Sequence, residues 1–213
     1  MLGSMKTHKS VLATLTFVAA LVLSLALSTR ATEAASPAEQ FVADSVQKAM
    51  GILNTTALSK EQRKTQFQSF LLGLTDIQAI GRYTIGPYRR SASPEDLTAF
   101  DAAFKEYALS VYQSYFAKYS GQTLKVTGST QLSADDIMVK TVTVDAKKPQ
   151  AKPYEVNFRV QTVNGHQIVS DFSVEGVWIR ELERNDFTSY LGQHNGDLKA
   201  LDQMLKQKAA QSR

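Results

Sequence analysis

The spacing of apolar residues in the first half of the chain predicts three amphipathic helices. Ser36, Ser59 and Ser93 each suit the N-cap position, and a proline follows the first and the third of them. Behind these starts, side chains recur at helical spacing, as Phe41, Ser45, Ala49 and Leu53, as Phe67, Phe70, Leu71, Leu74 and Ile77, and as Phe100, Phe104, Tyr107, Val111 and Tyr115. The third helix would end near Ser120-Gly121 after about 26 residues.

At Gly121 the apolar period changes from helical to alternating. The alternation predicts four strands, at 124–126, 138–144, 154–160 and 168–174, and two short helices follow at 186–191 and 196–208. Asn164-Gly165 predicts a tight hairpin, because both residues tolerate the positive φ of a type I′ turn. This order indicates an α+β fold, with N-terminal helices packed on one face of a curled antiparallel four-stranded sheet and short C-terminal helices.

The hairpin register makes Asp171 a candidate for acid–base chemistry. If the Asn-Gly pair forms the loop, Val160 faces Val169 and Phe158 faces Asp171. The carboxylate would then lie on the apolar face, where desolvation raises its pKa and creates a candidate general base. The alternative is a structural aspartate, paired with an arginine such as Arg82 or bonded to backbone amides. No second titratable group stands at a recognisable spacing, which favours the structural alternative.

Other motifs for catalysis or cofactor binding are missing from the sequence. It contains no cysteine, which removes disulfides, thiolate metal sites and a catalytic or lipid-modified cysteine. H-E-x-x-H, G-x-S-x-G and the phosphate-binding G-x-x-x-x-G-K-[ST] are also missing. His166 and His194 fall in turn regions and are expected to be exposed. No cofactor and no metal are therefore expected.

Residues 1–34 predict a signal peptide that is cleaved on export. Lys6 and Lys9 form a basic start, an apolar run covers residues 11–27, and Ala31 and Ala34 are candidate cleavage points. The alternative is a single membrane anchor, although the run is at the short end for a spanning helix. Cleavage would lower the net charge from +4 to +2. The remaining chain has no basic stripe, so nucleic acid is not an expected partner.

The segment IGRYTIGPYRRSASP, residues 80–94, interrupts the helical region, and an aromatic stripe follows it. The stripe that begins at Phe100 fits a filled core. It also fits one wall of a cavity whose other wall is Val156, Phe158 and Val160 on the sheet. A helix laid over a twisted sheet can leave a gap that accepts an acyl or polycyclic chain. Periodicity leaves both alternatives open.

The stretch from Asp76 to Phe104, D-x-x-x-I-G-R-Y-T-I-G-P-Y-R-R-S-A-S-P-E-D-L-x-x-F-x-x-x-F, resembles the MlaC-type periplasmic lipid carriers, also called toluene-tolerance auxiliary proteins. The resemblance continues through E-Y-A-L-x-x-Y at 106–112, Y-S-G-Q-T at 119–123 and S-D-F-S-V-E-G-V at 170–177. It covers residues 35–208 and leaves 209–213 as a polar tail. The sequence T-I-G-P-Y-R-R is similar to that of the hopanoid-associated HpnM branch of this family. Arg89 and Trp178 depart from the usual family pattern.

The resemblance implies a sheet similar to that of nuclear transport factor 2, with an apolar pocket for lipid tails between helices and sheet. It implies a periplasmic, non-enzymatic carrier of phospholipid or hopanoid-like lipid, working between an inner-membrane transporter complex and an outer-membrane partner. Residues 80–94 would form a kinked connection beside the pocket, with Gly81 and Gly86 allowing the turn. The expected lipid-binding residues are Ile80, Tyr83, Ile85, Phe104, Tyr107, Val111, Tyr115, Val142, Val156, Phe158, Val160, Val177 and Trp178.

Two other functions are also compatible with the sequence. The first is a small-molecule enzyme on the same fold, in which Asp171 and a pocket tyrosine act on an apolar substrate. The second is a secreted interaction module with a filled core, which would bind no lipid.

Overall fold

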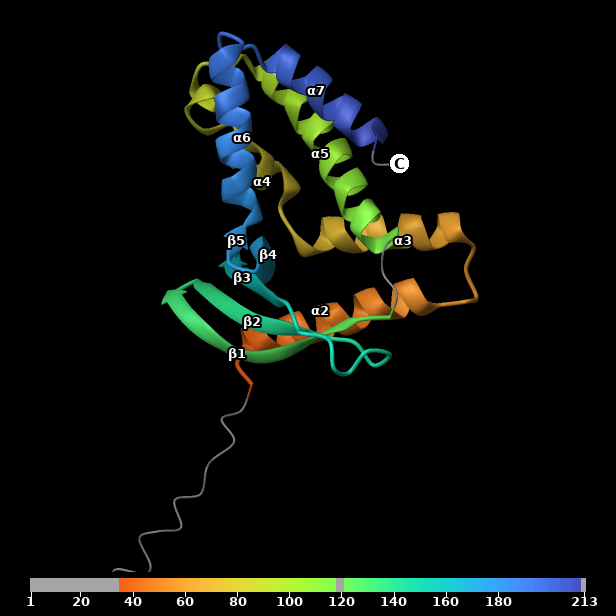
Figure 1. The fold of residues 1–213 in the computed structure, drawn as a ribbon. Coiled ribbons are helices and arrows are strands. Elements are labelled where there is room, and N and C mark those ends of the chain that lie inside the picture. The colour runs from red at the N-terminus through yellow and green to blue at the C-terminus, as the bar shows by residue number, and fades with distance from the viewer. Residues whose placement is uncertain (1–34, 118–120, 212–213) are drawn as a thin grey trace, which may run out of the picture. The chain divides into compact units, whose positions relative to one another are not determined.

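The computed structural model describes residues 35–117 and 121–211, with side chains described for 35–111 and 121–211 (Figure 1). The predicted signal peptide, residues 1–34, and the side chain of Tyr115 therefore lie outside the described residues. The helices before the sheet are α2 (Pro37–Asn54), α3 (Lys60–Leu74), α4 (Ile77–Thr84), the 3-10 helix η1 (Gly86–Arg90) and α5 (Pro94–Ala117). The strands are β1 (Thr123–Ser133), β2 (Asp136–Val144), β3 (Glu155–Val163), β4 (His166–Val174) and β5 (Val177–Trp178), followed by α6 (Ile179–Gln193) and α7 (Leu198–Gln211).

The three predicted helix starts are confirmed by their capping bonds. The backbone N–H groups of Glu39 and Gln62 each donate to the serine three residues earlier, at 3.2 Å, and both caps are complete capping boxes. The N–H of Asp96 donates to the Ser93 hydroxyl at 3.0 Å. Local sequence is sufficient to begin these helices, because each cap satisfies an amide that the helix itself leaves unpaired.

The sheet is an antiparallel meander in the order β1-β2-β3-β4-β5, so the predicted count of four strands is wrong by one. The missed strand is β5, whose two residues are too few to show an alternating pattern. β1 is also longer than predicted and continues to Ser133. Within the described ranges, no helix is long and apolar enough to cross a membrane.

The β3–β4 hairpin confirms the predicted turn but changes the register beyond it. Asn164 has φ 51° and Gly165 has φ 78°, and Val160 lies opposite Val169 as predicted. A bulge between Arg159 and Val160 then shifts the pairing by one residue. Asp171 therefore lies opposite Arg159, and the predicted pairing with Phe158 is wrong.

The register gives the sheet one apolar and one polar face. The apolar face carries Ile137, Val139, Val156, Phe158, Val160 and Phe172, while the polar face carries Asp136, Arg159, Gln161, Asp171 and Ser173. α2 packs on the apolar face, where Ala38 and Val42 join Val139 and Val160 in a buried cluster. We refer to these four residues, with the partly buried Phe41, Val46, Val126, Ile137 and Phe158 around them, as the sheet cluster.

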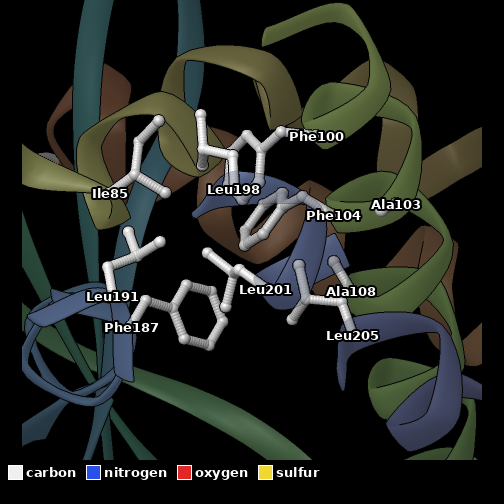
Figure 2. Close-up of a cluster of buried hydrophobic side chains, with 10 residues drawn as sticks. All are labelled: Ile85, Phe100, Ala103, Phe104, Ala108, Phe187, Leu191, Leu198, Leu201 and Leu205. Carbon is white, nitrogen blue, oxygen red and sulfur yellow. The ribbon is translucent and has the colours of Figure 1, made fainter. Parts of the chain in front are cut away.

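A second and separate group of buried side chains, the helical cluster, holds α4, α5, α6 and α7 together (Figure 2). Its members are Ile85, Phe100, Ala103, Phe104, Ala108, Phe187, Leu191, Leu198, Leu201 and Leu205. The aromatic stripe of α5 thus packs against α6 and α7. The proposed contact between this stripe and Val156, Phe158 and Val160 is not made, because those strand residues lie on the face that α2 covers.

Gly81, the start of α6 and the end of α7 differ from what the sequence predicts, whereas Gly86 agrees with it. Gly81 lies inside α4 and makes no turn; a Cβ placed there would lie 2.6 Å from Cδ1 of Phe104, so glycine permits close packing. Gly86 does make the turn, with φ 53°. α6 begins at Ile179, seven residues before its predicted start, because its first turns are polar and show no apolar period. α7 continues past the expected end of the domain, and Ala209 is fully buried.

Candidate lipid-binding site

The structure distributes the expected lipid-binding residues over distinct places. Ile85 and Phe104 belong to the helical cluster, and Ile80 and Tyr107 pack against it. Val156, Phe158 and Val160 share the apolar face of the sheet with Val177, whereas Val142 and Trp178 lie on its polar face. Val111 is half-buried on α5. Ile85 and Phe104 thus belong to one cluster and Phe158 and Val160 to the other, whereas Val111, Val142, Val156, Val177 and Trp178 belong to neither.

The sheet cluster is incompletely covered by the protein's own side chains. Its members Phe41, Val46, Val126 and Phe158 are only partly buried. Two surface hollows, of about 290 and 260 Å³, lie elsewhere and are built from α6 and α7, and from η1 and the α6–α7 turn. Of the expected lipid-binding residues whose side chains the structure describes, none lines either hollow.

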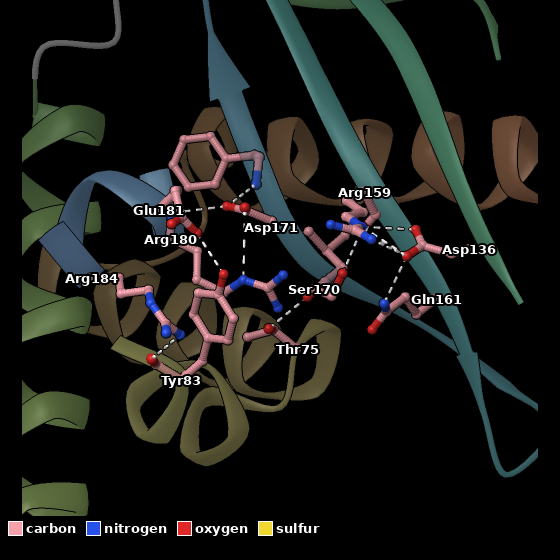
Figure 3. Close-up of polar contacts among 12 residues, drawn as sticks. Thr75, Tyr83, Asp136, Arg159, Gln161, Ser170, Asp171, Arg180, Glu181 and Arg184 are labelled. Atoms are coloured by element: carbon pink, nitrogen blue, oxygen red, sulfur yellow. Dashed lines mark hydrogen bonds and ion pairs between the residues drawn. The ribbon is translucent and has the colours of Figure 1, made fainter. Parts of the chain in front are cut away.

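Asp171 is a structural aspartate at the junction of β4 and α6 (Figure 3). Its carboxylate accepts the backbone N–H groups of Phe172 at 2.8 Å and Arg180 at 3.0 Å, and the Arg180 Nε lies 3.8 Å away. Burial raises the pKa of Asp171, while the N–H bonds and the charge of Arg180 oppose that rise. Arg82, the partner considered from sequence, instead pairs with Asp101 at 2.8 Å.

Tyr83 connects α4 to α6 through polar contacts (Figure 3). Its hydroxyl donates to Glu181 at 2.5 Å, and this bond is the main reason that the pKa of Tyr83 is raised. The guanidinium carbons of Arg180 and Arg184 lie 4.2 and 4.6 Å from its ring centroid. Arg184 also donates to the Tyr83 carbonyl at 3.3 Å. The side chain expected to line the lipid pocket therefore makes its described contacts with charged residues.

The polar face of the sheet holds a buried ion pair. Asp136, 7% exposed in its side chain, accepts from Arg159 at 2.6 Å and from Gln161 at 2.9 Å. Burial alone would raise the pKa of Asp136, but the hydrogen bonds from Arg159 and Gln161 outweigh it and hold the pKa below its usual value. This pair stands next to Asp171 and joins β2 to β3. Across the described residues, no cluster of His, Cys, Asp and Glu is placed to hold a metal ion.

Glu183 is a candidate site residue that sequence analysis missed. It lies on α6 one turn before the buried Phe187, and Tyr107 donates a hydrogen bond to its carboxylate. Although part of the residue is exposed, burial of the carboxyl is the main cause that raises its pKa from 4.5 to about 7, and the nearby Asp171 charge adds to the rise. The i, i+4 spacing to Phe187 would have indicated an inward position, had α6 been predicted to begin at Ile179.

The raised pKa of Glu183 predicts a pH-dependent stability. The folded protein keeps this proton between about pH 4.5 and pH 7 while the unfolded chain loses it, so stability falls as pH rises through that window. The full effect is about 3 kcal/mol at most. We expect Glu183→Gln to unfold at higher urea than the wild type at about pH 8, and at the same urea near pH 4. The exposed Glu61→Gln on α3 should show no such difference, and a pH-independent gap for Glu183→Gln would contradict the prediction.

Comparison with known proteins identifies the family. A family model described as MlaC protein matches residues 43–207. The chain belongs to the MlaC family. Proteins of this family are periplasmic lipid carriers without enzymatic activity, which removes the small-molecule enzyme from consideration. The structural role of Asp171 agrees with this conclusion.

One protein of similar sequence and one solved structure can be compared with this MlaC protein. The toluene tolerance protein ttg2D of Pseudomonas putida is 25% identical over 155 residues, which is 69% of this chain and 71% of ttg2D. The solved structure of the phospholipid-binding protein from Ralstonia solanacearum, in complex with a phospholipid, superposes with a TM-score of 0.70 at 20% identity. That match covers 83% of this chain and 99% of the other, and it confirms the MlaC-like α+β fold.

Proposed function

We propose that this MlaC protein carries a phospholipid, with the acyl chains held between the sheet cluster and the helical cluster. The observation that carries the proposal is the family match over residues 43–207, together with the fold that it shares with a protein solved in complex with a phospholipid. The division of the apolar side chains into two clusters supports it, since a protein with one filled core would merge them. Phe158 and Val156 on the sheet, and Val111 and Tyr107 on α5, are the walls we assign.

Burial of acyl chains supplies enough free energy for stable binding without a dedicated polar site. Several hundred Å² of apolar surface removed from water correspond to about 10 kcal/mol before the costs of association. The partly buried Phe41, Val46 and Phe158 provide apolar surface that a tail would cover. The headgroup would stay near the mouth, outside this apolar region.

The finer parts of the proposal concern cargo, route and export. The carrier would exchange lipid with an inner-membrane transporter complex and an outer-membrane partner, as expected of an MlaC protein. Residues 1–34 would direct export and then be removed. The T-I-G-P-Y-R-R segment keeps a hopanoid-like lipid as the second candidate cargo, and its mass distinguishes it from a phospholipid.

The test is native mass spectrometry, with lipid extraction, of protein purified from the periplasm without detergent. We expect a bound species with the mass of a phospholipid. Phe158→Glu should remove most of that lipid, because it places a carboxylate against the acyl chains. Val163→Glu is the matched control, since this residue lies on the same strand and is already 44% exposed.

Three results would overturn the proposal. A wild-type protein that emerges without lipid would support the interaction module with a filled core. Full lipid occupancy in a folded Phe158→Glu variant would show that the sheet does not form a wall of the lipid site. Equal loss in both variants would show that a new charge, and not its position, causes the effect.

A further inference from the structure

Glu183 places a titratable carboxyl beside the proposed lipid site. It lies on α6 one turn before the buried Phe187, and the Tyr107 hydroxyl of α5 donates a hydrogen bond to its carboxylate. The Tyr107 ring centroid is 6.3 Å from that of Phe104 and 6.0 Å from that of Phe187. Because we assign Tyr107 to the wall of the lipid site, an acyl chain that packs on this wall comes close to the Glu183 carboxyl.

The charges that act on this carboxyl come from β4, α6 and α7. Asp171 of β4 and Asp186 of α6 disfavour a negative charge on Glu183, whereas Lys208 of α7 and the Tyr107 hydroxyl favour it. Burial outweighs the favourable contributions and raises the pKa of Glu183 from 4.5 to about 7. This acid therefore changes its charge close to neutral pH.

The other charged groups on and around α6 are directed at partners other than Glu183. These contacts join Arg180 to Asp171, Arg184 to the Tyr83 carbonyl, Glu181 to the Tyr83 hydroxyl, and Arg82 to Asp101. On η1, Arg89 and Arg90 are exposed. The charge state of Glu183 therefore depends mainly on its burial and on Asp171.

We propose that Glu183 couples lipid loading to proton uptake, because an acyl chain seated against Tyr107 excludes water from the Glu183 carboxyl. A carboxylate that loses water without gaining a partner is strongly disfavoured, so the loaded carrier holds a proton that the empty carrier releases at higher pH. Lipid and proton then strengthen each other's binding, as linkage requires. The inference rests on the carrier function and on Tyr107 as one wall of its site.

The lipid affinity of the carrier should fall as pH rises through the pKa of Glu183. Below about pH 6 the empty carrier already holds the proton, so its affinity is constant there. Above about pH 7 a proton must bind together with the lipid, which weakens binding as protons become scarce. With a pKa of about 7, the expected loss of affinity between about pH 6 and pH 8 is roughly tenfold.

Two measurements on the purified protein test the coupling. The first is the fraction of protein that holds lipid after equilibration with excess phosphatidylcholine vesicles from about pH 6 to about pH 8, counted by native mass spectrometry. We expect the ratio of loaded to empty protein to fall roughly tenfold over this range. Phosphatidylcholine has no group that titrates near neutral pH, so the protein must supply the change.

The second measurement counts the proton directly. Protein from which lipid has been extracted is titrated calorimetrically with dioctanoyl phosphatidylcholine below its micelle concentration. Phosphate and Tris buffers differ in ionisation enthalpy, so the difference between the two heats gives the number of protons exchanged. We expect roughly 0.7 proton to be taken up per lipid at about pH 7.5.

Three variants assign the effect to one carboxyl. Glu183→Gln cannot ionise, so its lipid binding should be independent of pH and take up no proton. Tyr107→Phe removes a bond that favours the ionised form, so the fall in affinity should move to higher pH. Asp202→Asn is the matched control, because Asp202 on α7 is another buried acid, 5% exposed, whose pKa is raised to about 6. This control should keep the pH dependence of the wild type.

The outcomes separate the coupling from carriage. Wild-type protein that binds lipid equally from about pH 6 to pH 8 and takes up no proton would overturn the coupling and leave the carrier function standing. A pH dependence that persists in Glu183→Gln would belong to another group, such as the exposed His166 or His194, and would also overturn it. Equal effects of Glu183→Gln and Asp202→Asn would do the same. Wild-type protein that holds no lipid at any pH would overturn the carrier function, and the coupling with it.

Discussion

Replacing Phe104 with alanine should lower the free energy of unfolding by about 3–5 kcal/mol. Phe104 is 2% exposed and lies at the centre of the helical cluster (Figure 2). Its ring centroid is 5.8 Å from that of Phe100, 6.3 Å from that of Tyr107 and 6.3 Å from that of Phe187. Alanine would remove these contacts and leave a cavity that three helices cannot easily close. Urea denaturation measures the loss.

The control for this prediction is the neighbouring residue on α5. Lys105→Ala changes an exposed side chain and should alter stability by less than about 0.5 kcal/mol. A loss below about 1 kcal/mol for Phe104→Ala would show that the helices around it can move inward and refill the space.

The close packing of Gly81 against the Phe104 ring gives a second test of this cluster. In a free helix, Gly81→Ala would be stabilising by about 0.5–1 kcal/mol. Here the new methyl group would lie 2.6 and 2.9 Å from two ring atoms of Phe104, so we expect a net loss of stability. Phe104→Leu removes the ring and should make Gly81→Ala less costly. Equal effects of Gly81→Ala in the two backgrounds would contradict the contact.

Replacing Arg159 with methionine should destabilise the fold by about 2–3 kcal/mol at neutral pH. The change leaves the buried carboxylate of Asp136 with Gln161 as its remaining side-chain donor. The expected loss is at the lower end for a buried ion pair, because the Arg159 side chain is 35% exposed and water already screens its charge. Thermal and urea unfolding of the variant measure the loss.

A double-mutant cycle shows whether the loss belongs to the pair. Asp136→Leu together with Arg159→Met removes both charges, and the double variant should be more stable than Arg159→Met alone. The pKa of Asp136 is lowered in the folded protein, so the stability contributed by its ionised form is present at neutral pH and is lost in acid. The gap between wild type and Arg159→Met should therefore close as pH falls. A gap that is constant with pH would contradict the assignment.

The proposed lipid site and the helical cluster are tested by different residues. The partly buried Phe158 is the test of the lipid site, whereas Phe104 is the test of the helical cluster. The helical cluster contains Phe104 and Ile85, which the family resemblance suggested as lipid contacts but whose described neighbours are protein side chains. We therefore expect Phe158→Glu to affect lipid content directly, and Phe104→Ala to affect stability first.

The sequence by itself determined the features that depend on neighbouring residues. Ser36 and Ser59 begin helices because the cap and the amide that it satisfies are three residues apart. Asn164-Gly165 makes the hairpin because only two residues need positive φ. Alternation located four of the five strands, and the ordered motifs indicated the MlaC family before any geometry was known.

Only the tertiary structure decided which surfaces meet. A helical stripe predicts that Phe100 and Phe104 are buried, but it carries no information on the partner, which is α6 and α7 and not the sheet. One bulge after Arg159 moved Asp171 to the polar face, because a shift of one residue reverses the side of a strand. The raised pKa of Glu183 likewise comes first from burial and then from the charge of Asp171, which another element brings close to it. Local sequence specifies elements, whereas burial and charge at a site are sums over neighbours that only the folded chain brings together.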